Sequence, residues 1–145
     1  MKIFITGIAG FLGANLADYY ISKNFKVSGC DNLIGGTLDN IDTKKVNFFK
    51  ADCENLNEMT KIINDVDIVI HTAAYPHEGL SSFSPYLICK SNYIGSISVF
   101  TAAIQNNVKS VKKRMGLKSE HKTKTNFMEV AVNFFLLLFT PSFIF

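Results

Sequence analysis

The stretch Thr6-Gly7-Ile8-Ala9-Gly10-Phe11-Leu12-Gly13 is the feature that most narrows the folds open to this chain. It joins a β-branched and aromatic run at 2–6 to a segment with helical periodicity at 12–23, so it predicts a strand-to-helix turn. In such a turn Gly7 permits the tight bend, Gly10 lets the backbone approach a pyrophosphate, and Gly13 lets the helix pack on the strand. The start of the helix offers unpaired N–H groups to the phosphates. The spacing therefore predicts a dinucleotide-binding turn.

Strand-like and helix-like segments alternate after this turn. We expect strands at 2–6, 25–28, 46–51 and 67–71, and helices at 12–23, 57–64 and 85–107, the last with Ser84 as its N-cap. This alternation predicts an α/β fold of the doubly wound Rossmann type, with a parallel sheet in the order 3-2-1-4. After Val108 the sequence turns polar and basic without a clear period. No fifth strand is therefore expected, and the fold is predicted to be truncated before strand five.

An acidic residue indicates which dinucleotide such a fold would take. Asp31 comes directly after the second predicted strand, where a carboxylate can accept both hydroxyls of the adenosine ribose. Because the same carboxylate would repel a 2′-phosphate, the sequence favours NAD over NADP.

Composition excludes several other classes. With 145 residues, 48% of them hydrophobic and 19% charged, the chain is predicted to be globular and to hold one domain. The net charge of +3 comes from lysines crowded into 109–124, so no nucleic-acid surface is indicated. Cys30, Cys53 and Cys89 have no metal-ligand spacing and read as reduced thiols, so we expect a cytoplasmic protein without a metal site.

Several further motifs appear in order and carry a family resemblance. They are TGIAGFLG, CDNLIGG, KADCEN, DIVIHTAA and SNYIGSISVFTAA. Over 1–111 the chain resembles the extended short-chain dehydrogenase/reductase family, in the branch of NAD-dependent nucleotide-sugar epimerases and dehydratases typified by UDP-glucose 4-epimerase. The resemblance implies an incomplete NAD(P)-binding Rossmann domain at 1–111, followed by a basic and apolar tail at 112–145.

The resemblance also implies a cofactor site, with NAD as cofactor and a nucleotide sugar as substrate. Gly7, Gly10, Phe11, Leu12 and Gly13 would hold the pyrophosphate, Asp31 and Asn32 the adenosine ribose, and Asp52 and Cys53 would lie beside adenine. Thr72, Ala73 and Ala74 would line the nicotinamide side, and Asn92 would brace the strands around the site. His77-Glu78 would lie near the sugar nucleotide, whereas His71 is expected to be a packed or hydrogen-bonded residue.

Tyr86 and Lys90 have the Tyr-x-x-x-Lys spacing of a proton-transfer pair, since residues four apart share one face of a helix. In the resembling family the reactive pair follows strand five, whereas Tyr86 precedes it, so we interpret this match as chance. Between 111 and 145 there is no Tyr. The chain is therefore predicted to be catalytically incomplete, and its catalytic residues stay unassigned. The alternative is a non-catalytic dinucleotide-binding module.

Three interpretations of the tail stay open. It is the product of a truncation or frameshift, or 130–145 is a membrane anchor behind a basic segment, or the tail folds back over the sheet edge. The anchor is shorter than the ~20 residues usually needed. Because an unpaired fourth strand and the run 134–139 would both invite association, self-association is also expected.

Overall fold

The structure is a computed structural model that describes residues 1–75 and 82–113. Its elements, in chain order, are β1 (Lys2–Thr6), α1 (Phe11–Ser22), β2 (Lys26–Asp31), the 3₁₀ turn η1 (Leu38–Asn40), β3 (Val46–Lys50), α2 (Leu56–Ile62), β4 (Ile68–His71), α4 (Pro85–Cys89), the π-helical segment η2 (Lys90–Ile94), α5 (Gly95–Gln105) and β5 (Ser110–Lys113). The four predicted strands and three predicted helical regions are all present, with ends that differ by a few residues.

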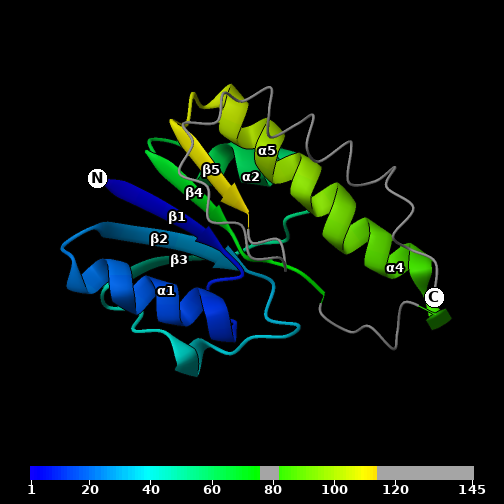
Figure 1. Ribbon diagram of the computed structural model, residues 1–145, viewed down its shortest axis with the longest axis horizontal. Helices are drawn as coiled ribbons and strands as arrows, with labels where there is room; N and C mark the ends of the chain where they lie inside the picture. The colour runs from blue at the N-terminus through cyan, green and yellow to red at the C-terminus, as the bar shows by residue number, and fades with distance from the viewer. Residues whose placement is uncertain (76–81, 114–145) are drawn as a thin grey trace, which may run out of the picture. The chain divides into compact units, whose positions relative to one another are not determined.

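The strands form one parallel sheet in the order β3-β2-β1-β4-β5 (Figure 1). The Rossmann-type order 3-2-1-4 is thus confirmed. The expectation of truncation before strand five was wrong, because Ser110–Lys113 pairs with β4 in a register that places Ile68 beside Ser110 and His71 beside Lys113.

The composition of β5 explains why the sequence did not predict a strand there. Three of the five residues from Lys109 to Lys113 are lysines, and Val111 alone is apolar and packs on the core beneath the sheet. Pairing comes instead from the row of backbone N–H and C=O groups that β4 presents at its edge. The long lysine side chains can run along apolar surface while their ammonium groups reach polar partners. The strand spans residues on both sides of the domain boundary predicted at 111, and that boundary stays a prediction.

Alternating side chains divide the core between the two faces of the sheet. Ile3 and Ile5 of β1 pack with Ala14 and Ala17 of α1 on one face. Phe4, between them, packs on the other face in a cluster with residues of α2 and α5. Figure 1 shows α1 on one side of the sheet and α2 with α5 on the other. This is the period of two expected for a strand buried on both faces.

The helical region at Pro85–Gln105 is interrupted rather than uniform. Pro85 begins α4 in the first turn, as predicted, but Ser84 makes no side-chain capping hydrogen bond. Between α4 and α5 the chain forms one π-helical turn, Lys90–Ile94, which carries Asn92. By length and composition alone this region could cross a membrane. Within it, Ser96 and Val99 are fully buried under the sheet. The proposed anchor at 130–145 lies outside the described residues.

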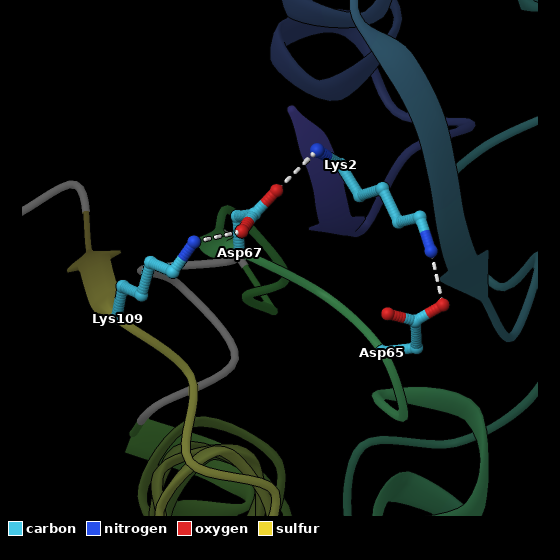
Figure 2. A network of polar contacts seen from close by, with 4 residues as sticks. All are labelled: Lys2, Asp65, Asp67 and Lys109. Atoms are coloured by element: carbon cyan, nitrogen blue, oxygen red, sulfur yellow. Dashed lines mark hydrogen bonds and ion pairs between the residues drawn. The ribbon is translucent and has the colours of Figure 1, made fainter.

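A network of hydrogen bonds and ion pairs joins the amino ends of β1, β4 and β5, at the edge of the sheet opposite the glycine turn. In Figure 2 the Asp67 carboxylate lies between two donors: the backbone N–H of Lys2 donates to Oδ2 at 2.8 Å, and the Lys109 ammonium donates to Oδ1 at 2.5 Å. The Lys2 ammonium pairs with Asp65. Asp67 therefore joins β1 to the residue that leads into β5, and these two donors, Lys109 foremost, hold its pKa below the usual value.

Candidate functional site

The carboxyl ends of β1, β2 and β4 meet around the glycine turn. Gly7 has a φ of +67°, and a Cβ on it would lie 2.8 Å from the Cα of Ala73, so both the conformation and the space require glycine. Its N–H donates to the carbonyl of Cys30 at 2.8 Å. The turn is thus wedged between the end of β2 and the segment that leaves β4.

Gly13 brings the first turn of α1 against this loop. A Cβ on Gly13 would lie 2.1 Å from the carbonyl oxygen of Gly7, which no side chain could tolerate. Gly10 occupies the N-cap and offers no side-chain capping group, and Phe11, the first residue of α1, is 87% exposed. The start of α1 therefore combines close backbone approach with the positive end of a helix dipole. Leu12 follows in the same turn.

β2 runs beyond the strand end predicted at 28, so Asp31 is the last residue of the strand instead of following it, and only 8% of Asp31 is exposed. Its Oδ2 accepts a hydrogen bond from the N–H of Ala9 at 3.0 Å, and its Oδ1 accepts one from Leu33 at 2.8 Å. The carboxylate thus anchors the glycine turn as well as the loop that follows β2. The sequence did not predict that Asp31 anchors the glycine turn. The only local signal was the spacing of Asp31 and Leu33, which is typical of a turn closed by an Asp side chain.

The residues predicted to lie beside ribose and adenine form a second group at this edge. The side-chain amide of Asn32 donates to Asp52 Oδ2 at 3.2 Å, and Asp52 Oδ1 accepts from the N–H of Glu54 at 2.9 Å. Cys53 is half-buried and lies beside Gly95 of α5. A Cβ added to Gly95 would lie 3.4 Å from the Cβ of Cys53. The structure therefore brings Asn32, Asp52 and Cys53 together, next to Asp31.

The segment leaving β4 is held by hydrogen bonds to β1 and to η2. The Thr72 hydroxyl donates to the carbonyl of Thr6 at 2.6 Å, and the N–H of Ala73 donates to the Thr6 hydroxyl at 3.3 Å. Asn92 clasps the backbone of Tyr75, because its Oδ1 accepts from the Tyr75 N–H at 2.6 Å and its Nδ2 donates to the Tyr75 carbonyl at 3.3 Å. Ala74, between these contacts, is exposed.

A buried polar chain that the sequence did not predict lies behind this segment. His71 Nδ1 is 2.6 Å from the Thr6 hydroxyl, and its Nε2 is 3.0 Å from the Ser96 hydroxyl, so His71 is the packed and hydrogen-bonded residue expected. The Lys113 ammonium donates to the same Ser96 oxygen at 2.5 Å. Burial, and secondarily the charge of Lys113, lowers the pKa of His71 to about 3, and burial lowers the pKa of Lys113 as well. His71 is therefore neutral at physiological pH.

Lys90, but not the exposed Tyr86, contacts the group around Asp52, because it pairs with Glu54. Tyr86 is 77% exposed, and the Lys90 ammonium pairs with Glu54 at 3.0 Å. That hydrogen bond is the main reason why the pKa of Lys90 is raised, with a smaller contribution from Tyr86. The interpretation of this pair as a chance match stays a prediction. His77 and Glu78 lie outside the described residues.

Two other features of residues 1–75 and 82–113 bear on where the site lies. No group of three or more His, Cys, Asp or Glu residues in these ranges could hold a metal ion. A hollow of about 370 Å³ is bordered by Lys2 and Lys26, at the amino ends of β1 and β2, and by Lys61 of α2. This hollow lies away from the carboxyl edge, where the glycine turn and Asp31 converge. We therefore place the candidate site at the carboxyl edge and not in the hollow.

A parallel sheet in this order, with a glycine turn opening the first helix and an acid ending the second strand, defines a Rossmann-type nucleotide-binding domain. The profile of the NAD dependent epimerase/dehydratase family matches residues 3–114. The chain belongs to this family.

Individual proteins agree with this assignment. A putative UDP-glucose 4-epimerase of Methanocaldococcus jannaschii is 36% identical over 98 residues, which cover 67% of this chain and 32% of the relative. The UDP-glucose 4-epimerase of Lactobacillus helveticus is 31% identical over 75% of this chain and 33% of its own length. Among solved structures, the Bordetella bronchiseptica enzyme WbmH in complex with NAD⁺ is 30% identical, with a TM-score of 0.68 over 76% of this chain and 37% of that one. The chain thus spans about a third of the length of these relatives.

Proposed function

We propose that this chain binds NAD along the carboxyl edge of its sheet and is the NAD-binding portion of an epimerase or dehydratase that acts on a nucleotide sugar. The observation that carries the proposal is the geometry of the glycine turn. Gly7 and Gly13 are held where any side chain would collide with backbone, and the uncapped start of α1 stands beside them. Such a turn accepts a pyrophosphate, because its backbone N–H groups and the helix dipole both favour negative charge.

The position of Asp31 supports the choice of NAD. Each carboxylate oxygen already accepts one backbone N–H, from Ala9 and from Leu33, and retains a lone pair for a ribose hydroxyl. Asn32 lies next to it. The same negative charge would repel the 2′-phosphate of NADP. The Bordetella enzyme that matches this chain was solved with NAD⁺, which is consistent with this choice.

The other end of the cofactor would lie along the segment that leaves β4. Thr72 and Ala73 are fixed to Thr6, and Asn92 fixes Tyr75, so this segment presents a rigid backbone beside the predicted nicotinamide position. NAD bound here would supply the oxidation of a sugar hydroxyl by accepting a hydride. The residues of this chain would bind and orient it, while the neutral His71 behind them would add no charge of its own to that wall.

The class of substrate is proposed from the family and from the names of the two epimerase relatives. We also propose that this chain by itself has no turnover. Two observations support this second point: Tyr86 is exposed, and the Lys90 ammonium pairs with Glu54. A proton-transfer pair would need the tyrosine hydroxyl to be positioned at a substrate.

Calorimetric titration of the full chain with NAD and with NADP tests the cofactor. Asp31→Asn keeps the shape of the side chain but loses its charge, so NAD affinity should fall about ten-fold or more, as expected for a lost charge-assisted hydrogen bond. The ratio of NADP to NAD affinity should rise at the same time. Asp18→Asn, an exposed position on α1, is the matched control and should change neither value.

The ratio of NADP to NAD affinity distinguishes the loss of ribose recognition by Asp31 from a general disruption of the glycine turn. If Asp31→Asn left NAD affinity unchanged, or lowered both affinities equally, ribose recognition by Asp31 would be wrong. Turnover is tested separately with NAD and a panel of UDP-, GDP- and dTDP-sugars. Any turnover would contradict the proposed lack of activity, and its loss in Tyr86→Phe would contradict the interpretation of Tyr86 and Lys90 as a chance match.

A further inference from the structure

The segment 72–75, which leaves β4, is held at both of its ends. At the first end the N–H of Ala73 donates to the Thr6 hydroxyl at 3.3 Å. At the second end the side chain of Asn92 bonds both the N–H and the carbonyl of Tyr75. Thr6 ends β1 and Asn92 belongs to η2, so the two anchors come from elements that are distant in the sequence.

Two buried side chains connect these anchors to each other. The Thr6 hydroxyl lies 2.6 Å from His71 Nδ1, and His71 Nε2 lies 3.0 Å from the Ser96 hydroxyl. The Ser96 hydroxyl in turn donates to the carbonyl of Asn92 at 2.5 Å. His71 is 2% exposed and Ser96 is 0% exposed, so water does not compete for these bonds. Together with the segment 72–75, the contacts close a ring.

The single hydroxyl proton of Ser96 fixes the direction of the bonds in this ring. Because that proton goes to the Asn92 carbonyl, the Ser96 oxygen can only accept from His71. The neutral imidazole of His71 therefore carries its proton on Nε2, and its Nδ1 accepts from the Thr6 hydroxyl. The Thr6 oxygen remains free to accept from the N–H of Ala73. Every donor in the ring thus faces an acceptor.

We propose that His71 and Ser96 are positioning residues for the nicotinamide half of NAD. Neither side chain would touch the cofactor. They fix the separation of the two anchors, and through them the segment 72–75, which lies beside the proposed nicotinamide position. The inference rests on the proposed NAD site and adds to it two buried residues that act from behind its wall.

The adenosine half of the cofactor would be held by other contacts. Asp31 would hold its ribose, and the loop beside adenine is tied to α5 by a different hydroxyl, since Ser98 donates to the carbonyl of Glu54 at 3.3 Å. ADP-ribose contains the adenosine and the pyrophosphate of NAD but lacks the nicotinamide. Opening the ring should therefore weaken the binding of NAD and leave the binding of ADP-ribose nearly unchanged.

Calorimetric titration of the full chain with NAD and with ADP-ribose tests this difference. Ser96→Ala removes the bonds to His71 and Asn92, so NAD affinity should fall about five-fold, as for the net loss of one hydrogen bond, and ADP-ribose affinity by less than about two-fold. Ser98→Ala is the matched control, because it removes another buried hydroxyl from α5. It should leave the ratio of the two affinities unchanged.

A merely structural role for Ser96 would weaken both ligands equally, and that result would overturn the proposal, as would no loss for either ligand. A wild type that binds ADP-ribose as tightly as NAD would also overturn it, while leaving the adenosine end of the proposed site intact. A wild type that binds neither ligand would refute the proposed cofactor site, and this inference with it.

Substitutions of His71 test the second positioning residue. His71→Leu removes both ring nitrogens and should lower NAD affinity as Ser96→Ala does, again without an equal loss for ADP-ribose. His71→Gln carries an amide oxygen and an amide nitrogen that can replace the acceptor and the donor, so it should recover part of the NAD affinity. Equal NAD affinity in His71→Leu and the wild type would overturn the role of His71. Should His71→Leu fail to fold, Ser96→Ala still decides the proposal.

Nitrogen NMR of the histidine rings in the full chain tests the ring of hydrogen bonds without any cofactor. The signals of His71, identified by their absence from His71→Gln, should be those of a neutral imidazole with its proton on Nε2. A proton on Nδ1 would contradict the order of donors and acceptors and overturn the connection between the two anchors, whatever the chain binds.

Discussion

The neutral, buried His71 predicts a specific loss of stability in acid. Its imidazole is 2% exposed and bonded to Thr6 and Ser96, with the Lys113 ammonium on the same Ser96 oxygen. In the folded protein its pKa falls from 6.5 to about 3. An unfolded chain takes up the proton near its ordinary pKa, so the unfolded state binds more protons at every pH between these two values. The stability that His71 contributes is therefore present above its unfolded pKa and is lost as the pH falls below it.

The magnitude follows from the difference between the two pKa values. Each pH unit below 6.5 lowers the free energy of unfolding by ~1.4 kcal/mol, so a change from about pH 7.5 to about pH 4.5 should remove roughly 2.7 kcal/mol through this residue alone. The loss would reach its limit near the folded pKa of about 3. For a domain of ordinary stability this is a large fraction of the total.

Urea unfolding followed by far-ultraviolet circular dichroism measures the effect, since the chain has no Trp to serve as a fluorescent probe. His71→Gln keeps hydrogen-bonding atoms but cannot titrate, so its stability should vary less with pH than that of the wild type. Other titrating groups, Lys113 and the acids among them, cancel to first order in this comparison. His71→Asn serves as a second variant. If wild type and variant lost equal free energy between pH 7.5 and pH 4.5, the assignment of a neutral buried imidazole would be refuted.

Two further predictions concern the two edges of the sheet. Gly13→Ala should lower the free energy of unfolding by ~1–3 kcal/mol or more and abolish NAD binding, because its Cβ would lie 2.1 Å from the Gly7 carbonyl oxygen. Gly35→Ala, where a Cβ meets nothing within 4 Å, is the control, and equal stability of the two variants in urea would contradict the packing argument. At the opposite edge, Lys109 and the Lys2 N–H lower the pKa of Asp67 from 3.8, so its contribution is present above that value and is lost as the pH falls below it. Asp67→Asn should therefore flatten the stability profile in this acid range, and unchanged slopes would count against the network.

The sequence by itself determined those features that depend on neighbours along the chain. The spacing of Gly7, Gly10 and Gly13 predicted the turn, and the structure shows why two of these positions admit only glycine. The β-branched and aromatic run at Lys2–Thr6 predicted the strand β1, and the order of the first four strands followed from the alternation of strands and helices. These signals are local, since periodicity and turn chemistry are set within a few residues.

Tertiary structure decided what depends on partners far along the chain. The segment Ser110–Lys113 has no apolar pattern and becomes a strand because β4 presents an edge to it. Asp31 anchors Ala9, and Asn32 reaches Asp52, only because parallel strands gather at one edge segments that the sequence keeps apart. The neutral state of His71 likewise depends on burial among residues of β1, α5 and β5. Backbone pairing and desolvation act through space, so no pattern within the individual segments could predict them.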